Sequence, residues 1–145
     1  KNCDNKIPKA KKFESVDNTL IENTKKNLPK LIKLINEQNL NEYIKLVVSF
    51  SFEANKYFND SEPWKHKKTN PERMNAIIYT ICEQIKNISI LLHPIIPLTT
   101  KKVLESMNFK KDDISIDNIL TNNIFNHNIK LKELDILFKK IEDDN

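Results

Sequence analysis

Seven apolar side chains recur, mostly at intervals of three or four residues, in the middle of the chain. They are Met74, Ile77, Ile78, Ile81, Ile85, Ile88 and Leu92. This spacing places them on one face of an α-helix. Pro71 suits the first helical position with Asn70 as its cap, and the pair His93–Pro94 stops the helix. The sequence therefore predicts an amphipathic helix over 71–92 that must pack its apolar face against other elements.

Two further helical patterns precede this segment. The first, over about 17–37, can be capped by Asp17 or Asn18, and Pro29 should kink or restart it because proline lacks a donor N–H. Its apolar stripe consists of Ile21, Thr24, Leu28, Leu31, Ile32 and Ile35. The second, over about 39–59, begins at Asn39, which can act as its N-cap. Its stripe consists of Leu40, Tyr43, Ile44, Val47, Ser51, Ala54 and Phe58.

The remaining segments complete the expected architecture. The turn at 60–63 ends the second helix, 64–70 is expected to be a polar loop, and a short helix begins at Pro97. The Asn- and Asp-rich segment 109–145 is expected to be irregular, with at most one helical turn and, at 113–117, the one candidate strand. Short loops between amphipathic helices predict an all-α antiparallel helix bundle with an irregular C-terminal extension. We expect a helical domain over 1–108, and an extension over 109–145 that packs back on the bundle or on a domain absent from this chain.

The 145 residues include no glycine. Gly-rich phosphate loops and the dinucleotide-binding fingerprint both require glycine, so neither is present. The formal net charge is +4, from 24 Lys and Arg against 20 Asp and Glu, which permits a polyanionic partner without requiring one. Almost every cation is a lysine, a bias expected of an AT-rich coding genome, so part of the basic character reflects codon use.

No segment has the features of a membrane span or a signal peptide. The longest apolar run, over 88–98, is interrupted by Ser89, His93, Pro94 and Pro97. Cys3 and Cys82 are far apart in the sequence and suggest no disulfide framework, so a reducing, cytoplasmic location is expected. The first residue is Lys1 rather than Met, and we expect the chain to be a fragment cut from a longer protein.

Residues with catalytic or metal-binding chemistry do not cluster in the sequence. His66, His93 and His127 are scattered, and none has a Cys, Asp or Glu at a spacing typical of a triad or a metal site. Adjacent acidic pairs occur in polar stretches where solvated carboxylates are expected. We therefore predict no catalytic residue, no metal site and no cofactor for this chain.

The segment 62–68, Glu-Pro-Trp-Lys-His-Lys-Lys, stands out chemically. Its Trp64 is the only tryptophan, and three lysines and a histidine follow it directly. One interpretation is that Trp64 plugs the end of the bundle against the next helix. The other is an aromatic platform in a positive patch, on which an unstacked RNA base lies while lysines hold phosphates.

The residues that lead up to Trp64 resemble a known family. The stretch 54–64, Ala-Asn-Lys-Tyr-Phe-Asn-Asp-Ser-Glu-Pro-Trp, resembles the Ala-Asn-Lys-Tyr…Pro-Trp stretch of bacterial methionyl-tRNA synthetases, in their C-terminal anticodon-binding domain. The segment 88–97 resembles the end of that family's next helix, which runs into a Pro-x-x-Pro turn.

Both ends of the chain add shorter likenesses. Residues 1–4 resemble the sequence just after the family's first bundle helix, so that helix would be missing here. Residues 137–142 resemble the family's closing Leu-Phe-Pro-Arg-Ile-Glu, with Lys139 and Lys140 in place of Pro and Arg. The likeness is in register over about 1–108 and thin beyond it.

The resemblance implies that the bundle reads the CAU anticodon of methionine tRNA and that Trp64 stacks on an anticodon base. Pro63 and Asn55 also match the motif; Asn55 either supports the Trp64 segment by hydrogen bonding or satisfies a helix-packing position, and Tyr57 is expected to be structural. The family's other anticodon contacts, an Asn and an Arg, lie on the missing helix. From their charge, the residues expected to bind the RNA backbone are Lys65, His66, Lys67 and Lys68.

The family is a group of class I aminoacyl-tRNA synthetases. Its catalytic domain carries His-Ile-Gly-His and Lys-Met-Ser-Lys-Ser signatures, and neither occurs here. The resemblance thus implies the C-terminal domain alone of an ATP-dependent methionine–tRNA ligase, inactive by itself, with ATP and Mg belonging to the missing catalytic domain. The implied partners are methionine tRNA and that catalytic domain, and neither DNA nor a membrane.

Two alternatives stay open at this point. One is the anticodon-binding domain of a related class I synthetase for isoleucine, valine, leucine or cysteine, although the Pro-Trp position favours methionine. The other is a helical interaction module that binds a protein through an apolar groove. This second alternative predicts an exposed apolar stripe and no salt-dependent RNA binding.

Overall fold

A computed structural model describes residues 3–121 and 130–138 of the chain, and in these residues every regular element is a helix. The long helices are α1 (Ser15–Lys26), α2 (Leu28–Asn36), α3 (Leu40–Ser61), α5 (Pro71–Leu92) and α6 (Pro97–Ser106). The short ones are α4 (Pro63–Thr69), the 3₁₀ turn η1 (Lys111–Asp113) and α7 (Asp117–Leu120). The predicted all-α fold class is confirmed, and the only strand-like pairing in the described residues is an isolated bridge between Lys6 and Lys130.

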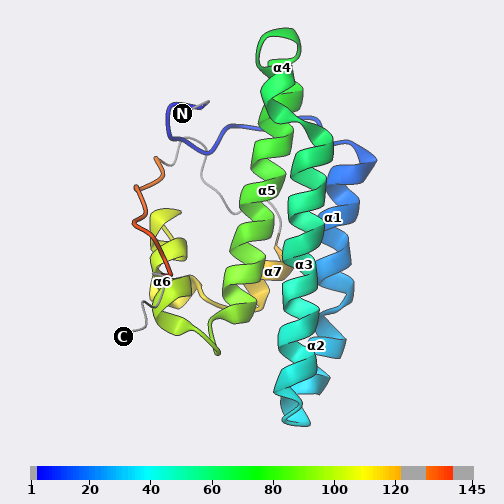
Figure 1. Cartoon of the computed structure of the whole chain (residues 1–145), viewed down its shortest axis with the longest axis vertical. Coiled ribbons are helices and arrows are strands. Elements are labelled where there is room, and N and C mark those ends of the chain that lie inside the picture. The colour runs from blue at the N-terminus through cyan, green and yellow to red at the C-terminus, as the bar shows by residue number, and fades with distance from the viewer. Residues whose placement is uncertain (1–2, 122–129, 139–145) are drawn as a thin grey trace, which may run out of the picture.

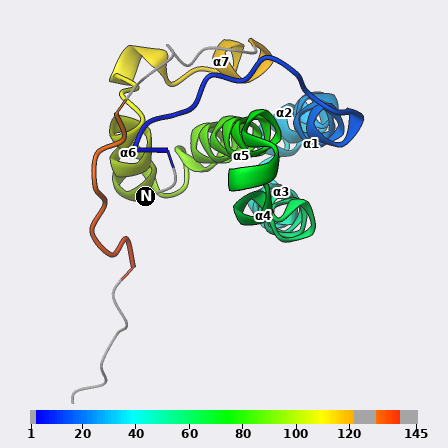
Figure 2. The same cartoon turned by 90° about the horizontal axis from the view of Figure 1, so that it is seen from above.

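Helix α5 forms the centre of the molecule. It contacts α1, α3, α4, α6 and α7, and Figures 1 and 2 show it between α6 on one side and the α1–α2 and α3–α4 columns on the other. The predicted start of α5 is confirmed, because Pro71 is its first residue and the Asn70 side chain accepts a hydrogen bond from the Arg73 backbone N–H at 3.2 Å. The predicted stop is confirmed too, since α5 ends just before His93.

The predicted helix over 17–37 is two helices. The break falls at Asn27, and Pro29 lies in the first turn of α2, where its missing N–H is tolerated. Of the two outcomes expected for this proline, a restart is the one observed. The predicted cap was wrong, because Glu14 is the N-cap of α1, and Asp17 lies inside the first turn, where it accepts the Glu14 backbone N–H at 2.9 Å.

The predicted burial of Ile32 and Ile35 was also wrong. Their exposed fractions are 44% and 40%. The other four members of the predicted stripe, Ile21, Thr24, Leu28 and Leu31, are buried. The restart breaks the continuity of the apolar face, and α2 packs on α3.

The segment 64–70, expected to be a loop, belongs mostly to helix α4. Pro63 is its first residue, and the fixed φ of proline favours that position. The polar side chains of α4 are mostly exposed, so the segment shows no apolar stripe by which a helix could be recognised. The expected end of the preceding helix is confirmed, since α3 stops at Ser61.

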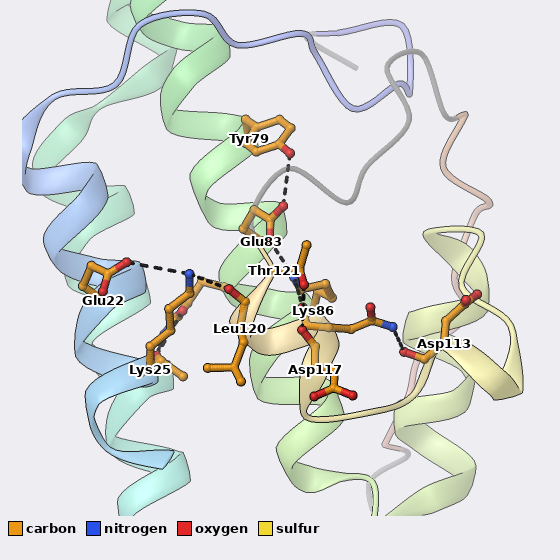
Figure 3. Close-up of polar contacts among 12 residues, drawn as sticks. Glu22, Lys25, Tyr79, Glu83, Lys86, Asp113, Asp117, Leu120 and Thr121 are labelled. Atoms are coloured by element: carbon orange, nitrogen blue, oxygen red, sulfur yellow. Dashed lines mark hydrogen bonds and ion pairs between the residues drawn. The ribbon is translucent and has the colours of Figure 1, made fainter. Parts of the chain in front are cut away.

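Of the C-terminal extension, residues 109–121 lie against the bundle, and the segment 130–138 contacts it at its start, where the Lys132 backbone N–H donates to Ser106 at 3.0 Å. Ile136 and Phe138 further along are exposed. The strand considered at 113–117 was wrong, because this stretch holds the end of η1, an irregular turn and the start of α7. Ile119 of α7 is fully buried. Figure 3 shows two lysines that donate to backbone carbonyls of α7: Lys86 to Asn118 at 2.7 Å and Lys25 to Leu120 at 3.1 Å. These contacts satisfy helix-end carbonyls that lack intrahelical partners.

Candidate functional site

The segment around Trp64 begins with a sharp change of direction between α3 and α4. Glu62, which separates the two helices, has φ 42° and ψ 56°, in the left-handed region. This region favours glycine, and the chain has none. Pro63 follows as the first residue of α4 and is buried, which fixes the start of the helix that presents Trp64. Figure 1 shows α4 at one end of the bundle, above α3 and α5.

Trp64 is half exposed. Its exposed fraction is 49%, and its ring packs edge-on against Phe58 of α3, with centroids 6.0 Å apart and planes at 69°. This geometry is typical of an aromatic pair. Trp64 is therefore supported by the bundle without being buried in it, and part of the indole stays available to a ligand.

Three lysines and a histidine follow Trp64 on α4. Lys65, Lys67 and Lys68 are exposed, and His66 is half-buried. Lys65 also forms an ion pair with Glu62 at 2.7 Å, across one turn. The structure thus places all four predicted backbone-binding residues on the short helix that carries Trp64, where an exposed ring and positive charges can meet one nucleic-acid strand.

The predicted supporting residues behave differently from one another. Pro63 is buried in the turn, as described above. Asn55 is exposed on α3 and makes no side-chain hydrogen bond to any residue that the structure describes, so its supporting role stays a prediction. Tyr57, expected to be structural, is buried, and its hydroxyl donates to Asp17 at 2.6 Å.

A buried ionic group at the same end of the bundle was not predicted from the sequence. Arg73 donates to both carboxylate oxygens of Asp17, at 2.5 and 3.0 Å, and its Nε lies 3.2 Å from a carboxylate oxygen of Glu14. Arg73 is the only arginine in the chain. That singularity was the one sequence signal that could have drawn attention to it, because arginine favours paired hydrogen bonds to a carboxylate.

Other chemistry is sparse in the described part of the chain. Within 3–121 and 130–138, no group of three or more His, Cys, Asp or Glu side chains is arranged to hold a metal ion. His93 shares a hydrogen bond with Thr100 at 2.9 Å, and His127 lies outside the described residues. Cys3 and Cys82 are free thiols, and burial raises the pKa of Cys82 to about 12. In the same residues, no helix is both long and apolar enough to cross a bilayer.

Solved structures contain the same fold. The free state of Mycobacterium tuberculosis methionyl-tRNA synthetase superposes with a TM-score of 0.88 at 20% identity, over 98% of this chain and 29% of that one. The architecture is thus a helix bundle of the kind found in an aminoacyl-tRNA synthetase. Residues 7–145 match the family described as the anticodon binding domain of methionyl tRNA ligase, and the chain belongs to that family.

Relatives with curated names agree with the family. The methionine–tRNA ligase of Cytophaga hutchinsonii is 31% identical over 140 residues, which are 97% of this chain and 20% of that protein. The methionine–tRNA ligase of Methanococcus vannielii is 33% identical over 140 residues, 93% of this chain and 20% of that protein. The chain therefore spans about a fifth of the length of the curated relatives it matches.

Proposed function

We propose that the α3–α4 end of the bundle binds the anticodon loop of methionine tRNA. The observation that carries this proposal is Trp64, an indole half exposed, supported by Phe58, and followed by cations on the same short helix. A base of the CAU anticodon stacks on the exposed part of the indole. Lys65, Lys67 and Lys68, with His66, contact the phosphates around it. The family match supports methionine tRNA rather than the tRNA of a sister synthetase.

The expected energetics separate these two kinds of contact. Stacking of one base on an aromatic ring contributes about 1–3 kcal/mol, or about 5- to 150-fold in affinity. Phosphate contacts add a term that weakens with salt, with a slope of roughly −0.7 per contact for a single strand. The chain is then expected to bind RNA weakly on its own, and most tightly at low salt.

The activity of the parent enzyme would be ligation of methionine to tRNA in the cytoplasm. The names of the relatives support this part of the proposal, and their length supports a separate catalytic domain beside this one. That catalytic domain would bind ATP and Mg, and this chain alone would attach no methionine. Its role would be to hold the anticodon loop while the catalytic domain acts on the other end of the tRNA.

One face of α5 carries an apolar stripe that suggests a further helix of the bundle in the parent chain. Beyond residue 75, every position of α5 that is not buried is aliphatic: Ile78, Ile81, Ile85, Ile88 and Leu92. They alternate at three and four residues, the spacing by which one helix packs against another. We propose that a helix of the parent, preceding residue 1, covers this stripe and completes the domain that we expect over 1–108.

Titration of Trp64 fluorescence with a methionine tRNA anticodon stem-loop at low salt tests the proposal. We expect the CAU stem-loop to quench the fluorescence and a stem-loop of altered anticodon to quench it less. The Trp64→Ala variant should bind more weakly, and its binding is followed with a labelled stem-loop because it has no tryptophan. If the chain does not bind, the titration is repeated with a longer chain that restores the preceding helix. Absence of binding by both chains would overturn the proposal.

A further inference from the structure

The Asp17 carboxylate is the most densely bonded acidic group in the described part of the chain. It is 1% exposed. Its Oδ1 accepts from the Tyr57 hydroxyl at 2.6 Å and from Arg73 Nη2 at 3.0 Å; its Oδ2 accepts from Arg73 Nη1 at 2.5 Å and from the Glu14 backbone N–H at 2.9 Å. We call this group of three side chains, Asp17, Tyr57 and Arg73, the Asp17 anchor. Its three side chains come from α1, α3 and α5, so one carboxylate joins three helices.

The position of the anchor along the chain links it to Trp64. Tyr57 lies in the last turns of α3, which ends at Ser61, and Arg73 lies in the first turn of α5, which begins at Pro71. Helix α4 is the only element between these two turns. Both ends of the segment that carries Trp64 are therefore fixed to the same carboxylate, and Phe58, the ring that supports Trp64, is the neighbour of Tyr57.

The protonation states keep the anchor in one arrangement. Burial alone would raise the pKa of Asp17, but hydrogen bonds from Arg73, Tyr57 and the Glu14 backbone outweigh it and lower the pKa. Burial, together with the charge of Asp17, raises the pKa of Tyr57. At neutral pH Asp17 is then charged and Tyr57 keeps the proton that it donates, so every bond of the anchor has its donor and its acceptor.

Stability alone is a weak reason for such a group. A buried ion pair is often no more stabilising than apolar side chains of the same volume, because both charges must leave water. What a carboxylate held by paired, directional bonds adds is orientation, since Arg73 can meet both oxygens of Asp17 in only a narrow range of geometries. Here the oriented parts are the two helix turns that flank α4.

We propose that the Asp17 anchor positions Trp64 for base stacking. Asp17, Tyr57 and Arg73 are positioning residues; they touch no RNA and act through the turns at the ends of α3 and α5. Without the anchor these turns move independently, α4 loses its fixed orientation, and the indole no longer meets the base in one geometry. This inference rests on the proposed RNA-binding function for its effect on affinity, but not for its effect on Trp64 itself.

Tyr57→Phe is the sharpest variant, because it removes the hydroxyl that bonds Asp17 and Thr80 and leaves the ring in the core. The matched control is Thr24→Val, which breaks a buried hydrogen bond between α1 and α5, where Gln84 donates to Thr24 at 2.8 Å. Gln84 lies about 16 Å further along α5 than Arg73, at 1.5 Å per residue. Both variants lose a buried hydrogen bond, but only Tyr57→Phe loses one near α4.

Four quantities are measured for the 145-residue chain: the urea midpoint, the emission maximum of Trp64 without RNA, its anisotropy without RNA, and the dissociation constant for the CAU stem-loop at low salt. We expect Tyr57→Phe to lower the Trp64 anisotropy, to shift its emission, and to weaken stem-loop binding about 3- to 10-fold, within the range of one stacking contact. Thr24→Val should lower the urea midpoint and leave the other three quantities unchanged. Arg73→Lys, which keeps the charge but not the paired bonds, should resemble Tyr57→Phe.

The outcomes separate the two proposals. An unchanged Trp64 signal in folded Tyr57→Phe, or an equal change in Thr24→Val, overturns the positioning role whatever the RNA result. If the wild-type chain and its longer form bind no stem-loop, the proposed function fails, and the RNA-free signal of Trp64 still decides whether the anchor positions it. If a variant unfolds, the folded one of Tyr57→Phe and Arg73→Lys gives the decision.

Discussion

Among the residues that the structure describes, two buried ionic groups have the same composition, a tyrosine, a carboxylate and a cation, and they are built in different ways. In the Asp17 anchor, Asp17 is separated in the sequence from Tyr57 by 40 positions and from Arg73 by 56 positions. The anchor therefore ties three helices together. The second group, called the Lys86 cluster, lies within α5: Lys86 pairs with Glu83 at 2.7 Å, and the Tyr79 hydroxyl donates to Glu83 at 3.1 Å. Its link beyond α5 runs from Lys86 to the Asn118 carbonyl, as Figure 3 shows.

The balance between burial and pairing also differs. Burial lowers the pKa of Lys86, and the opposing effect of Glu83 does not fully offset it. At Asp17 the partners outweigh burial, and the pKa falls. The anchor therefore favours its own charge, whereas the Lys86 cluster keeps a charge that burial disfavours in order to hold the extension. Similar residues at similar depth thus orient helices in one place and dock a separate segment in another.

The largest expected effect comes from breaking the Lys86 cluster. Lys86→Ala leaves Glu83 buried without its cation, and loss of one partner of a buried pair costs about 3–5 kcal/mol. Urea denaturation should show a loss of this size. The Trp64 emission should not change, because the cluster is remote from α4. A change in Trp64 as large as that in Tyr57→Phe would remove the distinction between the two groups.

A double variant is the control for this loss. In Lys86→Met with Glu83→Gln, both charges are gone and similar volumes remain. Most of the stability lost in Lys86→Ala should return, because the unpaired charge is the main cause of that loss. If the double variant is as unstable as the single one, packing rather than charge would explain the effect.

Acid should act on the other group. The pKa of Asp17 is lowered in the folded chain, so its contribution to stability is complete above the ordinary aspartate pKa of about 3.9 and is lost as the pH falls through the lowered folded value. Asp17→Asn is expected to lower the free energy of unfolding by about 1.5–3 kcal/mol at pH 7, the usual contribution of hydrogen bonds to a charged group. Between pH 5 and 2 the variant should lose less further stability than wild type. Parallel curves for the two chains would contradict this assignment.

Salt dependence compares the two ends of the bundle. Lys68 follows Trp64 by about one turn on α4, whereas Lys33 lies on α2 at the opposite end and is 73% exposed. Lys68→Gln should reduce the slope of log affinity against log salt for the stem-loop by roughly 0.7, the value of one phosphate contact. Lys33→Gln should leave the slope unchanged. Equal effects of the two variants would mean that binding is a general response to net charge.

The smallest effect is expected at the turn before Trp64. Glu62→Gly removes a side chain from a left-handed position and adds freedom to the unfolded chain, and these changes oppose each other. The unfolding free energy should therefore change by less than about 1 kcal/mol. Because the anchor fixes both ends of α4, the Trp64 anisotropy should stay close to wild type. A marked fall in anisotropy would show that the turn, rather than the anchor, orients the indole.

Most helices could be predicted because their signals are local. The cap at Asn70 and the starts at Pro71 and Pro97 are all confirmed. The predicted apolar face of α5 is buried only in part, because Met74 and Ile77 lie in the core whereas the other five members of the stripe do not. The mistakes lie where a local signal was weak or misleading. Asp17 is a good capping residue, and nothing near it in the sequence shows that its carboxylate points into the bundle toward Arg73. Helix α4 could not be recognised from an apolar stripe, because most of its side chains are polar and exposed.

The candidate site divides in the same way. Trp64 and the cations after it are neighbours in the sequence, so their proximity is certain once the segment is noticed. The supporting contact from Phe58 and the convergence of Tyr57 and Arg73 on one carboxylate depend on the packing of α1, α3 and α5.

The sequence by itself determined the helical class, the boundaries of the central helix and the aromatic–cationic segment, because spacing, proline positions and adjacency act over a few residues. Only the tertiary structure decided which faces are buried, how far the indole of Trp64 is exposed, and which residues hold its helix in place. Those properties arise from side chains tens of residues apart, which come together only when the helices pack.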